Sequence, residues 1–131
     1  MAKWTAAIIA RMDSLPPCPG WVFWGMDVSS CFKEAAVQRL FCIPGRIYTD
    51  KASMSTSWKD SVAWDFATPN GPKPMGSVIL IIKHHSGKFI KQFVAEEYKH
   101  EEEVLIKPGT QFRIMKCQNC GDHIISWMEE L

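Results

Sequence analysis

The second half of this chain is a series of short apolar segments separated by turn-forming residues. Dipeptides such as Ser86-Gly87 and Pro108-Gly109 stand between runs that are rich in Val, Ile, Leu and Phe. Helical patterns are confined to the first half. Strands that follow helices, instead of alternating with them, predict an α+β fold. The expected strands of this half cover residues 76–83, 88–94, 103–106, 111–116 and 123–128.

Three segments of the first half have the spacing of helices. From Ala2 to Ser14 apolar residues recur at three- and four-residue steps, and the Pro-rich segment 16–20 ends this helix. A second helix is expected over Cys31–Leu40 and a third over Trp58–Phe66. Strands are expected over 21–24, over 46–48, and in a region that ends at 55–57.

Length and charge exclude several classes of protein. The 131 residues are enough for one domain with its own core, which we assign to 1–131. Lys+Arg 15 against Asp+Glu 14 gives a net charge of +1, which argues against a nucleic-acid partner. The longest apolar run, Val78–Ile82, is too short to cross a membrane. The N-terminus lacks the pattern of a signal peptide, so we expect a mature protein with no membrane partner.

The cysteines indicate a reducing compartment. There are five, an odd number at scattered positions, and this is a poor framework for disulfides. Cytoplasm, or the cytosol of a target cell, fits such thiols, and the sequence does not choose between them. They are Cys18, Cys31, Cys42, Cys117 and Cys120.

The pair Cys117 and Cys120 permits two interpretations. Segment 118–122 is rich in turn formers between two apolar runs, and we favour a tight turn there. The alternative is a structural zinc site, but it would need two further ligands and no second Cys-x-x-Cys is present. Histidines such as His123 are the remaining candidates. We therefore expect no metal.

Acidic residues directly precede one of the expected strands. In Glu101-Glu102-Glu103, strand alternation would place Glu101 and Glu103 on one face, where mutual repulsion would raise the pKa of at least one of them. The alternative is a solvated acidic turn, because Glu96 and Glu97 lie just upstream. Charge pattern alone favours that alternative.

Three further features are individually weak. The hydroxyl run 55–57 precedes an expected helix, and Ser57 could cap it. The aromatic strand Trp21–Trp24 ends at Gly25, and Phe66 follows on the flank of a helix. Each of these features alone is typical of a structural core or a helix cap.

Taken together and in this order, these features resemble the mono-ADP-ribosyltransferases of the Arg–Ser–Glu class, which are arginine-modifying bacterial toxins and vertebrate ecto-enzymes. The resemblance covers nearly the whole chain, and its most specific part is Glu103–Ile114. It implies N-terminal helices followed by two packed, mainly antiparallel sheets around an NAD cleft. No glycine-rich phosphate-binding fingerprint is present, so NAD as substrate rests on the resemblance.

The resemblance also implies roles for single residues. Glu103 matches the catalytic glutamate, which bonds the 2′-hydroxyl of the nicotinamide ribose, and Glu101 matches the acid that positions and deprotonates a target arginine. Ser55 matches the serine that orients Glu103. Tyr98 matches an exposed contact in the loop, 94–100, that recognises the protein target. The matching NAD-binding residues are Trp24, Gly25 (carboxamide), Ser55, Thr56, Ser57, Phe66 (nicotinamide ring) and Arg46.

One position departs from the class. Trp24 stands where the class has its arginine, just before the Gly, and Trp cannot form a bidentate charged contact with phosphate. Another cation could substitute, or Trp24 could stack on the cofactor, or the domain could be catalytically silent. The candidate cations are Arg46, Arg11, Arg39 and Lys51, of which Arg46 is closest to Ser55 in sequence.

These observations leave three functions. The first is ADP-ribose transfer from NAD to a protein side chain, with arginine indicated by Glu101. The second is an NAD glycohydrolase, which would pass ADP-ribose to water at the same site. The third is a silent binding module, or a small domain whose acidic and hydroxyl runs are only surface features. The intact Ser-Thr-Ser and Glu-x-Glu motifs favour the transferase.

Overall fold

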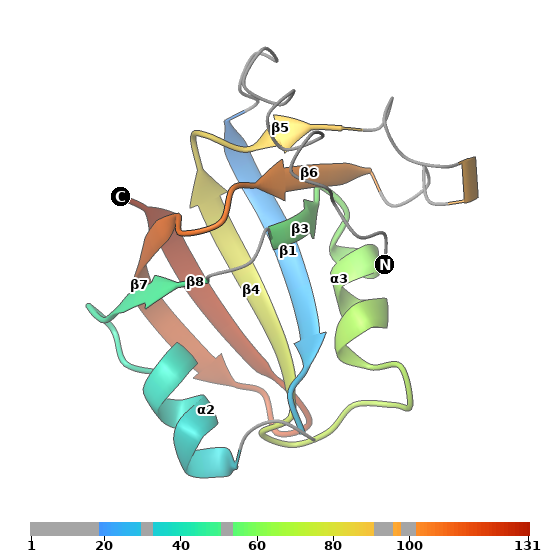
Figure 1. Ribbon diagram of the computed structural model, residues 1–131. Helices are drawn as coiled ribbons and strands as arrows, with labels where there is room; N and C mark the ends of the chain where they lie inside the picture. Colours follow the sequence, from blue (N-terminus) through green and yellow to red (C-terminus); the bar gives the residue numbers. More distant parts are fainter. Residues whose placement is uncertain (1–18, 30–32, 51–53, 91–95, 98–101) are drawn as a thin grey trace.

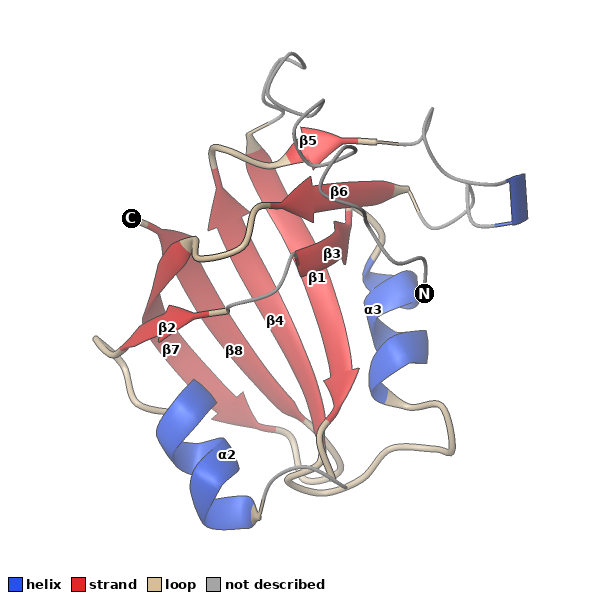
Figure 2. Cartoon of the chain, viewed as in Figure 1, coloured by secondary structure: helices blue, strands red, loops and turns tan. Residues whose placement is uncertain are grey.

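The chain forms a mixed sheet with helices beside it (Figures 1 and 2). This computed structural model describes residues 19–29, 33–50, 54–90, 96–97 and 102–131. The sheet has eight strands in the order β2-β7-β8-β4-β1-β3-β6-β5. The elements are β1 (Gly20–Asp27), α2 (Glu34–Phe41), β2 (Ile47–Thr49), β3 (Met54–Ser57), α3 (Asp60–Ala67), β4 (Ser77–His84), β5 (Lys88–Phe89), β6 (Glu103–Ile106), β7 (Gln111–Asn119) and β8 (Ile124–Glu130).

The strand pairing confirms the α+β prediction. Neighbouring strands are antiparallel, except that β4 and β8 are parallel. The expected strands of the second half are present, and β7 and β8 run two or three residues further than predicted. The helix expected over 2–14 lies outside the described residues, as does most of the strand expected beyond Phe89.

The two sheets that the resemblance implies are joined into one hydrogen-bonded sheet. The long strands β1, β4, β8 and β7 form one part, and the short strands β3, β6 and β5 cross in front of it (Figure 1). One residue pair in the described chain, Phe23 with Ser57, gives the register at this junction. The sheet therefore bends at the point where β1 meets β3.

The main core lies between these two parts and beneath α2. Val22 and Leu80 reach it from the long strands, Val104 and Ile106 from β6, and Phe41 from α2. All five side chains are completely or almost completely buried. Burial of this apolar surface holds the short strands against the long ones.

Helix α3 begins two residues later than its apolar spacing predicts. The backbone amide of Lys59 donates a hydrogen bond to Oγ of Ser57 at 3.0 Å, and Lys59 itself is extended (φ −98, ψ 120) and is the N-cap. Ser57 thus binds the backbone just ahead of the helix and does not occupy the cap position. The first helical residue is Asp60.

The turn predicted around Cys117 and Cys120 is confirmed. The amide of Cys120 donates to the carbonyl of His123 at 2.9 Å, and Gly121 takes a left-handed φ of +92 that suits glycine. No group of three or more His, Cys, Asp or Glu side chains in the described part of the chain is arranged to hold a metal ion. None of the described helices is long and apolar enough to span a membrane.

The end of β1 carries an acid that is bound on several sides. Oδ1 of Asp27 accepts hydrogen bonds from Oγ (2.6 Å) and N (3.0 Å) of Ser29, and Oδ2 pairs with Nζ of Lys73 at 3.0 Å. The hydrogen bonds from Ser29, followed by the bond from Lys73, lower the pKa of Asp27 from 3.8 to about 2. Asp27 is therefore ionised throughout the neutral range.

This lowered pKa predicts a pH-dependent contribution to stability. A folded-state pKa below the unfolded value stabilises the fold above pH 3.8, and the contribution is lost as the pH falls through about 2. We expect Asp27→Asn to unfold more easily than the wild type at pH 6, and the difference to shrink towards pH 2. Urea unfolding at both pH values measures this, with the exposed Asp65→Asn as control. An unchanged difference at pH 2 would contradict the assignment.

Candidate active site

Three adjacent strands bring the sequence motifs together. Ser57 on β3 lies opposite Phe23 on β1 and opposite Glu103 on β6. The aromatic strand, the Ser-Thr-Ser run and the last residue of the Glu-x-Glu motif therefore form one row at the bend of the sheet (Figure 1). The residues come from segments more than 30 positions apart in sequence, and pairing alone makes them neighbours.

Glu103 begins β6 and is buried, with 4% of its surface exposed. Its partner in the row, Ser57, is 2% exposed. The carbonyl of Glu103 accepts a hydrogen bond from the amide of Ile90 at 3.2 Å, which fixes its backbone against the neighbouring strand. A carboxyl group held in such a place acts on a nearby charge more strongly than it would in water.

The residue before Glu103 has an unusual backbone conformation. Glu102 lies in the left-handed region at φ 49, and its carbonyl accepts a hydrogen bond from the amide of Trp58 at 3.4 Å. The strand starts only at Glu103, so the regular strand alternation expected through Glu101-Glu102-Glu103 does not hold at Glu102. Glu101 itself lies outside the described residues. Left-handed backbone conformations of residues other than glycine, such as that of Glu102, are enriched at functional sites.

The Ser-Thr-Ser run connects β3 to the neighbouring strand β6. Oγ1 of Thr56 donates a buried hydrogen bond to the carbonyl of Val104 at 2.6 Å. Thr56 thus has a structural role in joining β3 to β6. Ser55 lies opposite Leu105 in the register of the same strand pair.

Trp24 lines a cavity of about 400 Å³ on the core side of β1. At the edge of this cavity, Oη of Tyr48 donates a hydrogen bond of 3.0 Å to Oδ2 of Asp50. Burial, followed by the proximity of Asp50, raises the pKa of Tyr48 well above its ordinary value, so the phenol keeps its proton. The lining residues are Trp24, Met26, Leu40, Phe41, Tyr48, Thr49 and Asp50.

The other candidate residues are placed less centrally. Arg46 is exposed just before β2, where its carbonyl accepts from the amide of Ile114 at 2.9 Å, and Arg39 is exposed in the last turn of α2. Phe66 is half-buried on α3. None of these three lines the Trp24 cavity. Arg11, Lys51, Tyr98 and Glu101 lie outside the described residues.

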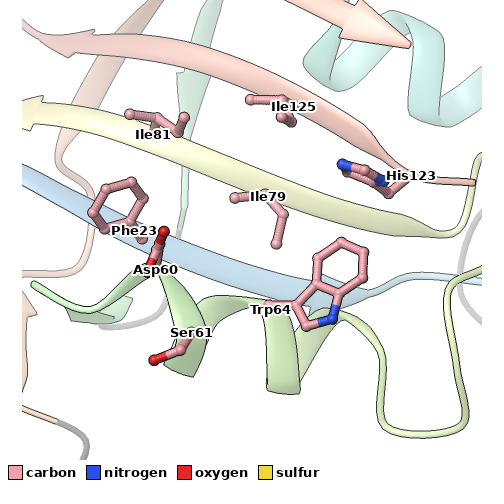
Figure 3. Close-up of a pocket in the computed structure, with 8 residues that line it drawn as sticks. All are labelled: Phe23, Asp60, Ser61, Trp64, Ile79, Ile81, His123 and Ile125. Atoms are coloured by element: carbon pink, nitrogen blue, oxygen red, sulfur yellow. The ribbon is translucent and has the colours of Figure 1, made fainter. Parts of the chain in front are cut away.

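A second cavity, of about 430 Å³, lies on the opposite face of β1 and was not expected from the sequence (Figure 3). Phe23 and Ile81 lie towards one end of this cavity. At the other end, Trp64 and His123 pack edge to face, with their ring centroids 4.9 Å apart. The alternating isoleucines Ile79 and Ile81 on β4 were the available signal for this face. The lining residues are Phe23, Asp60, Ser61, Trp64, Ile79, Ile81, His123 and Ile125.

Gly25 is the point where α3 touches β1. A Cβ atom built on Gly25 would lie 1.6 Å from the carbonyl oxygen of Ala63 on α3. Ala63 and Ala67 are buried against Ile79 at this contact. The helix can approach the strand this closely only because residue 25 has no side chain.

Comparison with protein families gives one match. The sequence profile of the family described as "ADP-ribosyltransferase exoenzyme" matches residues 23–125. This range runs from β1 into β8 and includes every candidate site residue named above except Arg11. No curated protein matches the chain.

Several solved structures share the fold. The Vis toxin, an ADP-ribosyltransferase from Vibrio splendidus, superposes with a TM-score of 0.72 at 22% identity, over 95% of this chain and 54% of Vis. ADP-ribosyltransferase HopU1 of Pseudomonas syringae pv. tomato DC3000 gives 0.68 at 20% identity, over 88% and 46%. The catalytic domain of VahC from Aeromonas hydrophila gives 0.65 at 19%, over 96% and 68%. The chain thus spans about half the length of the first two.

Proposed function

The chain belongs to the ADP-ribosyltransferase exoenzyme family, and on that premise we propose that it transfers ADP-ribose from NAD to a protein side chain and releases nicotinamide. The observation that carries the proposal is the row formed by Phe23, Ser57 and buried Glu103 across three adjacent strands. It unites the motifs on which the family resemblance depends.

The chemistry requires a fixed negative charge. When the bond between nicotinamide and ribose breaks, the bonding electrons leave with nicotinamide and positive charge develops on the ribose, as in glycoside hydrolysis. Glu103 is the carboxylate that we assign to this charge. A group oriented before the reaction stabilises the transition state more than the ground state.

The remaining roles follow the family pattern. We assign Ser55 to orienting Glu103, Glu101 to binding and deprotonating the target side chain, and Phe66 to packing on the nicotinamide ring. Gly25 would bind the carboxamide through its backbone. The loop around Tyr98 would contact the protein target.

Arginine is the target side chain that we propose. A structure of Vis exists in complex with agmatine, a compound that carries a guanidinium group like that of arginine. Glu101 would pair with such a cation, since carboxylates bind guanidinium through two parallel hydrogen bonds.

The family pattern assigns Trp24 to NAD in place of the class arginine, although its side chain lies on the core face of β1 and that of Phe23, a member of the row, lies on the other face. The ring of Trp24 lines the 400 Å³ cavity, and an indole face stacks well on a planar ring. We expect Trp24→Ala to weaken NAD binding by roughly tenfold. Titration followed by tryptophan fluorescence and by calorimetry measures this.

The matched control for Trp24 is on the same strand. Trp21 lies three residues earlier, on the other face of β1, and is 51% exposed. We expect Trp21→Ala to leave NAD affinity unchanged. Equal affinities of the two variants would remove Trp24 from the site.

Incubation of the protein with labelled NAD and a cell lysate tests the proposed function. A labelled protein band supports transfer. Free ADP-ribose without a labelled band indicates an NAD glycohydrolase. NAD that is neither bound nor consumed indicates a silent domain, one of the three interpretations that Trp24 leaves open.

A further inference from the structure

Helix α2 ends beside strand β7, and this brings two thiols together. On β8, Ser126 lies opposite Cys117 of β7 in the sheet register. Oγ of Ser126 donates a buried hydrogen bond of 2.7 Å to the carbonyl of Phe41, the last residue of α2. The next residue is Cys42, so this bond holds Cys42 close to the strand position of Cys117.

A second contact fixes the chain on the other side of Cys42. The amide of Gly45 donates to the carbonyl of Ile114 at 2.7 Å, and the amide of Ile114 donates to the carbonyl of Arg46 at 2.9 Å. The segment after α2 therefore runs along β7. The two contacts bracket Cys42 at Phe41 and Gly45, and on the sheet they lie at Ser126, which is opposite Cys117, and at Ile114, which precedes Cys117 on β7.

The two side chains pack in the same environment. Cys42 and Cys117 are partly buried against the same hydrophobic core, and both are free thiols. Burial, together with a hydrogen bond to the Cys42 side chain, raises the pKa of Cys117 to about 12. A disulfide requires Cα atoms within about 7 Å of each other, and the hydrogen bonds above hold the two segments as neighbours.

We propose that Cys42 and Cys117 are a site of reversible disulfide formation. The oxidant is a small-molecule disulfide such as oxidised glutathione. One cysteine thiolate attacks it, forming a mixed disulfide and releasing one thiol. The second cysteine then attacks the mixed disulfide at the protein sulfur and releases the other thiol. Two protein S–H bonds are oxidised and one disulfide is reduced to two thiols.

The crosslink would join α2 to the sheet across a long loop. Cys42 and Cys117 are 75 positions apart, and closing a loop of that size restricts the unfolded chain strongly. We expect the unfolding midpoint to rise by roughly 10 °C on oxidation. The crosslink would also fix Leu40 and Phe41, which line the Trp24 cavity.

Mass spectrometry of the full chain tests the proposal. The reduced protein is incubated with oxidised glutathione, remaining thiols are alkylated, and the digest is analysed without reduction. We expect a loss of two hydrogen atoms and a linked peptide pair that contains Cys42 and Cys117. Reduction with dithiothreitol should restore both thiols and the lower unfolding midpoint.

Two variants identify the partners. Cys42→Ala should lose the crosslink and the rise in midpoint, whereas Cys120→Ala, which changes an exposed cysteine of the adjacent turn, should keep both. The linked peptide pair is sought in the wild-type protein, so the proposal can be tested even if a variant folds poorly. A link from Cys117 to Cys120, or glutathione on both thiols without a link, would overturn the proposal.

Discussion

Replacing Glu103 with Gln is expected to reduce ADP-ribose transfer by a factor of about 10²–10³. The amide has nearly the shape of the carboxylate but no negative charge to place near the developing positive charge of the ribose. Because Glu103 is 4% exposed, this charge acts in a site that is largely shielded from water. The measurement is initial rates of NAD consumption and of target labelling.

The fold should survive this substitution. Gln fills the same volume, and the amide of Ile90 can still donate to the backbone carbonyl of residue 103. Circular dichroism and the unfolding midpoint check this, and the exposed Glu129→Gln is the matched control, for which we expect full activity. Near-normal NAD turnover by Glu103→Gln would contradict the assignment of Glu103.

Local patterns in the sequence were enough to predict most strands. The apolar runs Val78–Ile82 and Val104–Ile106 lie in β4 and β6 as expected, and all of their residues except Ile81 are buried. The turn at Gly121 was predictable because the residues around it disfavour regular structure. Each of these features depends on residues close together in the chain.

The arrangement of the site depends on contacts that the local sequence does not specify. Ser57 and Glu103 are 46 positions apart, and neither spacing nor the family resemblance, which assigned Ser55 to Glu103, predicted that these two residues lie opposite each other. No sequence pattern predicts the left-handed backbone of Glu102, because glutamate normally avoids that region. The cavity beside Trp24 needs α2 and β2, which only the tertiary fold brings to β1.

Gly25→Ala is expected to have the largest effect on stability. The new methyl group would lie 1.6 Å from the carbonyl oxygen of Ala63, so α3 would have to move away from β1. The neighbouring atom is backbone, and no side-chain rotation relieves the clash. We expect a loss of about 3 kcal/mol or more in the free energy of unfolding, a large share of the stability of a domain this size. Urea unfolding at neutral pH measures it.

Gly71→Ala is the matched control because it separates the clash from the general cost of replacing a glycine. Gly71 has a φ of +89, and no atom lies within 4 Å of the position of its Cβ, so we expect a loss of only about 1 kcal/mol. A loss at Gly25 no greater than that at Gly71 would show that α3 does not touch β1 there. If the contact is real, Gly25 is required for packing whether or not its backbone binds NAD. Reduced activity of Gly25→Ala is therefore evidence about the cofactor only at temperatures where the variant remains folded.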